Sequence, residues 1–247
     1  MGNLDYQVSW REDLTTSRDD ADRQRCNFIY TALNTRELVS FSYYSLDRPL
    51  QISILKRNQL SNAVRAYQNI WYYADAYREL WTAAEARAAI DALEDCFVAI
   101  DELDQVVALA GGKLLSLSDN PELLGAIENA SRTYYFAELG RVAGVKNSRV
   151  GAFLFELTMI NAIRKGYEEF ILITAETGDI IKKTVPNPAR KLYESHGYRL
   201  VPRNDGTLIG CQCVQKRSNN QMISDWRPYY YTTATAFRQI MGLPKSK

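Results

Sequence analysis

The chain has 247 residues, of which 30 are Lys or Arg and 29 are Asp or Glu, so its formal net charge is +1. Hydrophobic residues make up 46% of the sequence, enough to bury one substantial core. A near-neutral charge argues against proteins that bind nucleic acid or anionic membrane surfaces over a wide area. No apolar run approaches the roughly twenty residues of a membrane span, and the polar start MGNLDYQVSW is unlike a secretory signal. We therefore expect a cytoplasmic protein.

Cysteine and histidine, the usual zinc ligands, are scarce. The candidates are Cys26, Cys96, Cys211, Cys213 and His196. They do not supply a plausible set of zinc ligands, and we predict no metal site. Cys211 and Cys213 stand two apart in an alternating strand pattern, which places both side chains on one face. We interpret them as small buried hydrophobic residues in a reducing compartment rather than as a redox pair.

Hydrophobic spacing predicts most of the secondary structure in the first half of the chain. The elements are, in order, a helix over 17–36, a strand over 50–55, helices over 60–71 and 83–93, and a hairpin of strands 96–100 and 106–110. The hairpin strands flank an acidic turn, and Gly111 and Gly112 mark a bulge or the end of the second strand.

The second half alternates strands with helices. The patterns predict a strand over 134–142, a helix over 150–165, a buried strand over 170–174, a helix over 189–195, and a last hairpin over 198–215. Gly166 and Gly197 follow the two helices as stop signals. This order predicts an α/β fold with a mixed sheet.

Three segments of the second half carry a family resemblance. They are Asn187–Tyr198, Phe136–Ala143 and Arg149–Leu154. In this order and spacing, residues 48–217 resemble the GNAT acyltransferases. The resemblance implies a mostly antiparallel central sheet flanked by helices. Outside the resemblance, we expect a helical extension over 1–47 and an aromatic extension over 218–247. The resemblance also implies an N-acyltransferase, in which a primary amine directly attacks an acyl group carried on a pantetheine thioester.

The resemblance places the donor at the start of the helix that begins near Val150. A strand that leads through a short loop into a helix points several backbone N–H groups at one spot, where a phosphate binds readily. The candidate donor-binding residues are Val142, Lys146, Ser148, Arg149, Val150, Gly151, Ala152 and Asn187.

The phosphate loop departs from the family pattern, which has glycines where this chain has Lys146, Asn147, Ser148 and Arg149. Two alternatives follow. The cations supply charge to the diphosphate of coenzyme A, or the site accepts the single phosphate of an acyl carrier protein. The second alternative gains weight because Glu138–Arg141 and Leu154–Phe155 resemble acyltransferases that make N-acyl amino acids and acyl-homoserine lactones.

The chemistry needs a base for the amine and an acid for the leaving thiolate. By resemblance, Glu138 is the base and Tyr193 the acid, and the main-chain N–H around Val142 holds the thioester carbonyl. The alternatives are that Glu138 pairs with Arg141 or a surface lysine and that Tyr193 is a packing aromatic. We expect His196 to cap a helix C-terminus or lie on the surface, rather than to act in catalysis.

Aromatic residues gather in two further regions. Tyr67, Tyr72, Tyr73 and Trp81 are predicted to line an acceptor or acyl groove, although an amphipathic helix explains them equally well. The tail residues Trp226–Tyr231 are expected to dock, as cover for a sheet edge, as a dimer contact or around an acyl chain.

These features favour a donor longer than acetyl, with an amino acid or a Lys or Orn side chain of a peptide as the acceptor. The alternative from another class is a catalytically silent GNAT-like binding module.

Overall fold

The computed structural model describes residues 6–13, 15–35, 39–45, 48–73, 79–145, 149–174, 188–216 and 221–244. The strands are β1 (Tyr6–Arg11), β2 (Val39–Ser45), β3 (Arg48–Ile54), β4 (Asp95–Ile100), β5 (Val106–Leu114), β6 (Thr133–Arg141), β7 (Glu169–Ile173), β8 (Arg199–Leu200), β9 (Gly210–Lys216) and β10 (Met222–Thr233). The α-helices are α1 (Arg18–Thr35), α2 (Leu60–Tyr73), α3 (Ala83–Asp91), α4 (Val150–Arg164), α5 (Pro188–Ser195) and α6 (Ala234–Met241). Short 3-10 turns are η1 (Arg57–Gln59), η2 (Pro121–Leu123) and η3 (Ala130–Arg132).

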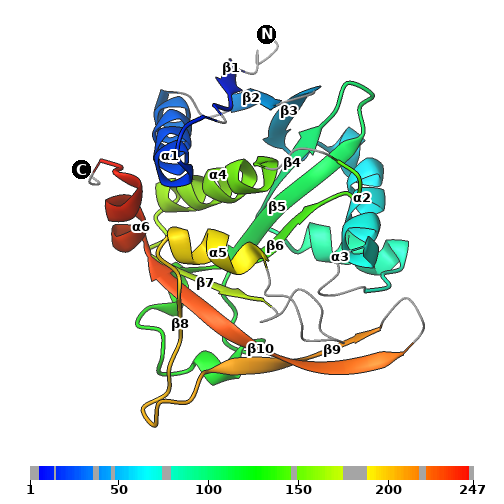
Figure 1. The fold of residues 1–247 in the computed structure, drawn as a ribbon. Coiled ribbons are helices and arrows are strands. Elements are labelled where there is room, and N and C mark those ends of the chain that lie inside the picture. The colour runs from blue at the N-terminus through cyan, green and yellow to red at the C-terminus, as the bar shows by residue number, and fades with distance from the viewer. Residues whose placement is uncertain are drawn as a thin grey trace.

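In this part of the chain, the strands form one 10-stranded sheet with the order β1-β2-β3-β4-β5-β6-β7-β10-β8, and β9 pairs with β10 (Figure 1). The pairs β1/β2 and β6/β7 are parallel and the others are antiparallel. The predicted fold class, a mixed and mostly antiparallel sheet flanked by helices, is confirmed. The hairpin of β9 and β10 projects at the far end from β1 (Figure 1).

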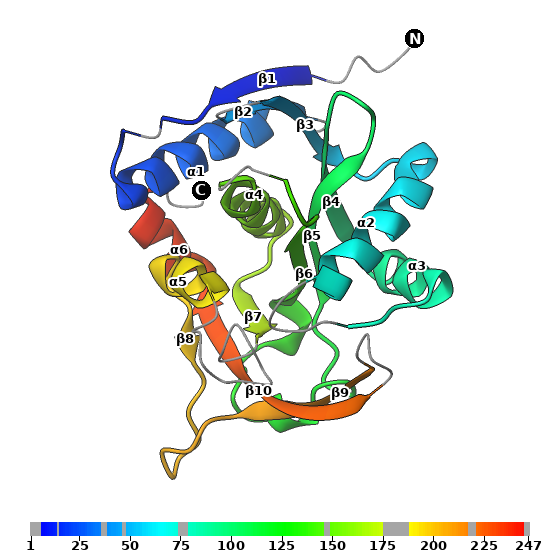
Figure 2. The same cartoon turned by 45° about the vertical axis from the view of Figure 1, so that its right-hand side comes forward.

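Helices cover the two faces of the sheet unequally. Helices α1, α4, α5 and α6 lie on one side, and α2 and α3 lie on the other (Figure 2). The larger hydrophobic core lies under the first group and includes nearly the whole of α4, from Phe153 to Ile163. A smaller core joins α2 and α3 to β4 and β5. Because α4 is apolar on almost all sides, it needs this cover from α1 as well as the sheet.

Strands β6 and β7 diverge partway along their length. Their pairing runs from Thr133 opposite Glu169 to Tyr135 opposite Ile171. Beyond that point β6 continues to Arg141 beside β5, while β7 ends at Ile173 beside β10. The sheet therefore opens between two parallel strands, at the level where Glu138 stands on β6.

Gly140 lets α2 approach this opening closely. A Cβ atom at Gly140 would stand 2.1 Å from the Cγ2 of Ile70, so only a residue without a side chain fits beneath the helix. The close approach of α2 to β6 brings the side chain of Tyr67 to that of Glu138.

The predicted elements between residues 50 and 195 are confirmed to within a few residues. At both ends the structure differs from the prediction. The first 47 residues supply strands β1 and β2 of the main sheet as well as α1. The predicted hairpin over 198–215 is present only near its turn, where Pro202 and Leu208 form an antiparallel bridge, because β8 and β9 on either side of it each pair with β10. Residues 222–233 form β10, a strand inside the sheet rather than a segment packed onto it.

No helix in the described ranges combines the length and the apolar character that crossing a bilayer would require.

Candidate active site

A cavity of about 460 Å³ lies on the α2 and α3 face of the sheet, where β6 and β7 diverge. It is lined by Tyr67, Trp71, Glu79, Leu80, Trp81, Glu85, Tyr135, Ala137, Glu138, Ile173, Cys213, Met222 and Arg227. These residues come from α2, the segment before α3, strands β6 and β7, and the β9–β10 hairpin. The cavity thus has aromatic walls and a floor made by the two diverging strands.

Glu138 is the titratable group on that floor. The hydroxyl of Tyr67 donates a hydrogen bond to its carboxylate at 2.9 Å. Burial raises the pKa of Glu138 to about 8 and the Glu79 carboxylate adds to the rise, whereas the Tyr67 hydrogen bond opposes it. A carboxylate with a pKa near neutrality can exchange a proton with a bound amine at physiological pH.

An ion pair between Glu79 and Arg227 joins the segment before α3 to the β9–β10 hairpin. The guanidinium of Arg227 lies 3.2 Å from the Glu79 carboxylate, and each side chain is only 11% exposed. The indole of Trp81 donates to the other oxygen of Glu79 at 2.7 Å. An ion pair with so little exposure loses much of its hydration, so each charged group depends on its protein partners. The charge-assisted hydrogen bonds of Arg227 and Trp81 therefore fix the position of the Glu79 carboxylate.

No family model matches the sequence, and no curated protein matches it. Solved structures do match. An N-acetyltransferase from Staphylococcus aureus Mu50 matches with a TM-score of 0.51 at 13% identity, covering 74% of this chain and 98% of that one. A GCN5-related N-acetyltransferase from Kribbella flavida matches with a TM-score of 0.51 at 15% identity, covering 74% and 97%. A GNAT superfamily phosphinothricin acetyltransferase from Sinorhizobium meliloti, solved in complex with AcCoA, matches with a TM-score of 0.50 at 11% identity, covering 74% and 88%.

This chain has the GNAT fold. The resemblance drawn from the three sequence segments is therefore confirmed at the level of the fold.

Within the GNAT fold, the start of α4 is the predicted donor site. Helix α4 begins at Val150 without a side-chain hydrogen bond to its first turn. Gly151 has open space around it, and Ala152 is half-buried. The predicted donor residues Lys146, Ser148 and Asn187 lie outside the described residues.

Two of the predicted donor residues have other partners. The N–H of Val142 donates to the carbonyl of Val107 on β5 at 2.9 Å, so it points away from the opening between β6 and β7. Successive N–H groups of a strand point to opposite sides, which directs those of Leu139 and Arg141 toward β7. The side chain of Arg149 lies 2.9 Å from the carboxylate of Glu12.

Tyr193 lies on the other face of the sheet from Glu138. It belongs to α5, is 6% exposed, and packs against Phe155, Tyr198 and Tyr230. It does not line the cavity. A group that reacts with both residues would therefore have to pass through the opening between β6 and β7.

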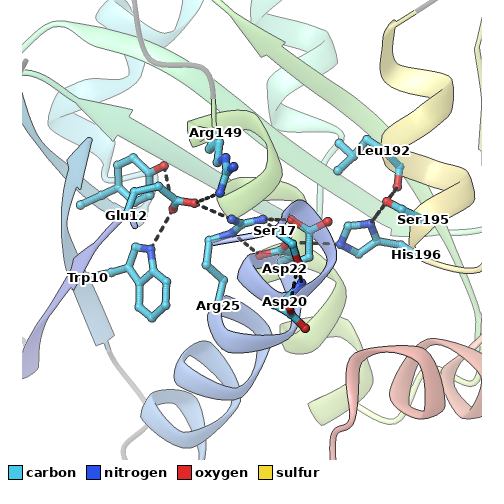
Figure 3. Close-up of polar contacts among 12 residues, drawn as sticks. Trp10, Glu12, Ser17, Asp20, Asp22, Arg25, Arg149, Leu192, Ser195 and His196 are labelled. Carbon is cyan, nitrogen blue, oxygen red and sulfur yellow. Dashed lines mark hydrogen bonds and ion pairs between the residues drawn. The ribbon is translucent and has the colours of Figure 1, made fainter. Parts of the chain in front are cut away.

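A buried ionic cluster fixes the N-terminal segment against α4 (Figure 3). The guanidinium of Arg25, which is fully buried, lies 2.7 Å from Glu12 and binds both oxygens of Glu156 at 2.8 and 2.9 Å. Asp22 also forms an ion pair with the guanidinium of Arg25. Burial raises the pKa of Glu156, but the charge of Arg25 outweighs it, so this pKa stays below its usual range.

His196 joins the same cluster from the end of α5. Its Nδ1 donates to the carbonyl of Leu192 at 2.7 Å, and its Nε2 lies 3.1 Å from Glu156 (Figure 3). The predicted capping role is confirmed, but His196 is fully buried and not on the surface.

Cys26, Glu156 and His196 place possible metal ligands within 4.8 Å of one another. Both oxygens of Glu156 already bind Arg25, and a cation there would have to displace that guanidinium. We assign this group to structure.

The predicted acceptor residues divide into two pairs. Tyr67 and Trp81 line the cavity. Tyr72 and Tyr73 are exposed at the end of α2 and contact each other edge to face, with ring centroids 4.8 Å apart. Sequence reasoning missed Tyr135, Glu79, Arg227, Met222 and Cys213 as cavity residues. Tyr135 and Glu138 stand three apart on the predicted strand, a spacing that places side chains on opposite faces of a regular strand. The register shift opposite Gly111 and Gly112 brings both into the cavity. The other four residues reach the cavity through long-range packing.

Proposed function

We propose that this protein is an N-acyltransferase that moves an acyl group from acyl-coenzyme A to a primary amine. The observation that carries the proposal is the position of Glu138, a carboxylate with a pKa of about 8, in a cavity at the opening between β6 and β7. A carboxylate whose pKa lies near physiological pH, at the base of an aromatic pocket, is suited to accept a proton from a bound amine.

In the proposed reaction the amine binds in the cavity and the thioester enters the opening from the side of α4 and α5. The nitrogen attacks the carbonyl carbon while Glu138 accepts its proton, and the carbon–sulfur bond then breaks. We propose that Tyr193 protonates the departing thiolate. Backbone N–H groups of β6 that point toward β7, at Leu139 and Arg141, are proposed to stabilise the carbonyl oxygen in place of Val142.

The length of the acyl chain depends on how much apolar wall is available to it. Tyr229 and Tyr230, which the sequence suggested as walls, are fully buried within the sheet. Trp226 is 42% exposed on the hairpin, and Tyr73 is 58% exposed at the end of α2. The long-chain prediction thus keeps Tyr67 and Trp81, which line the cavity, but loses Tyr229 and Tyr230. We propose acetyl-coenzyme A as the first donor to test, ahead of longer acyl chains and of an acyl carrier protein.

The direct test measures thermal stabilisation and free-thiol release with acyl-coenzyme A donors of two to sixteen carbons and a panel of amines: amino acids, polyamines and lysine peptides. A donor that binds the folded chain at a hundred times its Kd raises the unfolding free energy by about 2.7 kcal/mol. Binding without thiol release for any amine would favour a silent binding module, and no binding of any donor would refute the proposed function.

Replacing Glu138 tests the chemistry itself. We expect Glu138→Gln to lower kcat by about a hundredfold near pH 7.5, and by less at pH 10, where free amine is abundant. The wild-type kcat should rise with pH as Glu138 loses its proton, with the midpoint of the rise near pH 8. Glu85→Gln alters another carboxylate of the same cavity and is the matched control, with an expected change below about threefold. An equal defect at every pH would point to a structural role for Glu138.

A further inference from the structure

Two thiols stand together beside the cavity. Cys211 and Cys213 lie on one face of β9, and their sulfur atoms are 3.5 Å apart. Both side chains are half-buried, and Cys213 lines the cavity together with Arg227 and Glu138. The other two cysteines, Cys26 and Cys96, are buried in the hydrophobic cores.

The backbone geometry of β9 permits a bond between these sulfurs. Alternate residues of a strand have Cα atoms about 6.6 to 6.8 Å apart, which is at the upper end of the range that a disulfide spans. Within the described residues β9 pairs only with β10, so it is an edge strand. An edge strand can bend by the small amount that closing the sulfur–sulfur distance requires, because only one ladder of hydrogen bonds holds it.

The surroundings favour reaction at Cys211. A hydrogen bond from Cys213 lowers the pKa of Cys211 to about 7, with contributions from Tyr229 and the charge of Arg227, although burial opposes the shift. Burial instead raises the pKa of Cys96 to about 12 and that of Cys26 well above its usual value. Since the thiolate is the reactive form, Cys211 should react while the two core cysteines stay inert.

We propose that Cys211 and Cys213 form a reversible dithiol–disulfide site in the cavity wall, oxidised by low-molecular-weight disulfides such as oxidised glutathione. The thiolate of Cys211 attacks one sulfur of the small disulfide, forming a mixed disulfide and releasing one thiol. Cys213 then attacks the sulfur of Cys211 and releases the second. Both cysteines are oxidised to one disulfide, one small disulfide is reduced to two thiols, and the two thiol protons leave on the products.

The test exposes the folded full-length chain to oxidised glutathione at pH 7.5, traps remaining thiols with iodoacetamide and analyses tryptic peptides by mass spectrometry. Cys211 and Cys213 share the peptide over 204–216, because no Lys or Arg lies between Arg203 and Lys216. We expect that peptide to be unalkylated and lighter by two hydrogen atoms, and to become doubly alkylated after dithiothreitol. The peptides that contain Cys26 and Cys96 are internal controls and should carry no glutathione.

Two matched variants test the order of attack. Cys213→Ser keeps a hydrogen-bond donor beside Cys211 but removes the resolving sulfur, so the reaction should stop with one glutathione on Cys211. Cys211→Ser removes the proposed attacking thiol, so glutathione should add to Cys213 about fivefold more slowly than it adds to Cys211 in Cys213→Ser. A wild-type peptide that stays fully reduced, or that carries two separate glutathiones, would overturn the proposal.

A functional consequence rests on the proposed acyltransferase activity. Because Cys213 forms part of the cavity wall, the disulfide should raise the KM for the amine several-fold while leaving donor affinity unchanged. The double variant Cys211→Ser/Cys213→Ser keeps no thiol on β9, so its KM should not respond to oxidised glutathione. The peptide analysis needs no turnover, so failure of the acyltransferase proposal and failure of the dithiol proposal are distinguishable.

Discussion

At the scale of single residues, Glu138 is a carboxylate that is removed from water and still lines a cavity. Its carboxylate is flanked by the Tyr67 hydroxyl and the aromatic walls, and burial of its charged form dominates its pKa. Tyr193 has the opposite setting, enclosed by aromatic rings on the other face of the sheet. The two proposed proton-transfer groups are therefore separated by the sheet and meet only through its opening.

The raised pKa of Glu138 makes stability depend on pH. A folded-state pKa of about 8, above the ordinary 4.5, means that the folded protein holds this proton more tightly than the unfolded chain. The contribution is fully present below pH 4.5 and is lost as the pH rises through 8. We expect Glu138→Gln, which stays neutral, to exceed wild type by about 1 to 3 kcal/mol at pH 9 in urea unfolding. A difference that does not change from pH 5 to pH 9 would contradict the assigned shift.

The hydroxyl of Tyr193 can be tested apart from its ring. Tyr193→Phe keeps the packing against Phe155 and Tyr230, so the unfolding midpoint should change little. We expect turnover to fall about ten- to a thousandfold with unchanged donor affinity, because only the acid for the thiolate is removed. Tyr198→Phe, in the same aromatic cluster, removes a hydroxyl that donates to the sulfur of Met159 and is the control. Equal turnover of the two variants would exclude Tyr193 as the acid.

At the scale of elements, the site depends on how closely α2 lies on β6. The absence of a side chain at Gly140 allows Ile70 to touch the strand, and the same helix then delivers Tyr67 and Trp71 to the cavity. The other wall comes from the β9–β10 hairpin, which carries Arg227 to Glu79. A helix and a hairpin that are far apart along the chain thus form opposite sides of one pocket.

Adding one methyl group at Gly140 should disturb this contact. We expect Gly140→Ala to destabilise the fold by about 1 to 3 kcal/mol, because its Cβ would overlap Ile70, and to weaken the Tyr67 contact with Glu138. Gly151→Ala, at a helical site with open space, should be neutral or stabilise by up to about 1 kcal/mol. Chemical denaturation measures both. If the clash is the cause, Gly140→Ala combined with Ile70→Ala should cost less than the sum of the single changes.

At the scale of the whole molecule, the N-terminal segment is connected to the second half of the chain. Arg25 on α1 binds Glu156 on α4 across 131 positions of sequence, and His196 after α5 contacts the same carboxylate. Strands β1 and β2 extend the main sheet at one end, and β10 lies between β7 and β8 at the other. The N-terminal region therefore helps to hold α4 in place, and the C-terminal region supplies a strand of the sheet.

Replacing Arg25 should show how much the buried ionic cluster contributes to the free energy of unfolding. Arg25→Met leaves Glu12 and Glu156 buried without their main counter-ion, and we expect a loss of about 3 to 5 kcal/mol in urea unfolding. Arg87→Met breaks an exposed pair with Asp91 and should cost no more than about 0.5 kcal/mol. Similar small losses in both variants would mean that the cluster contributes little.

The sequence by itself determined the elements between residues 50 and 195 and the placement of Glu138 on a strand. Apolar spacing and glycine stops are local, and α4 and β7 could be found from them alone. Only the tertiary structure decided that β10 enters the sheet, that Arg227 reaches Glu79 across 148 positions, and that Cys213 lies in the cavity wall. Alternation shows which side chains share a face of a strand, but strand pairing and the docking of distant elements depend on contacts that no local pattern encodes.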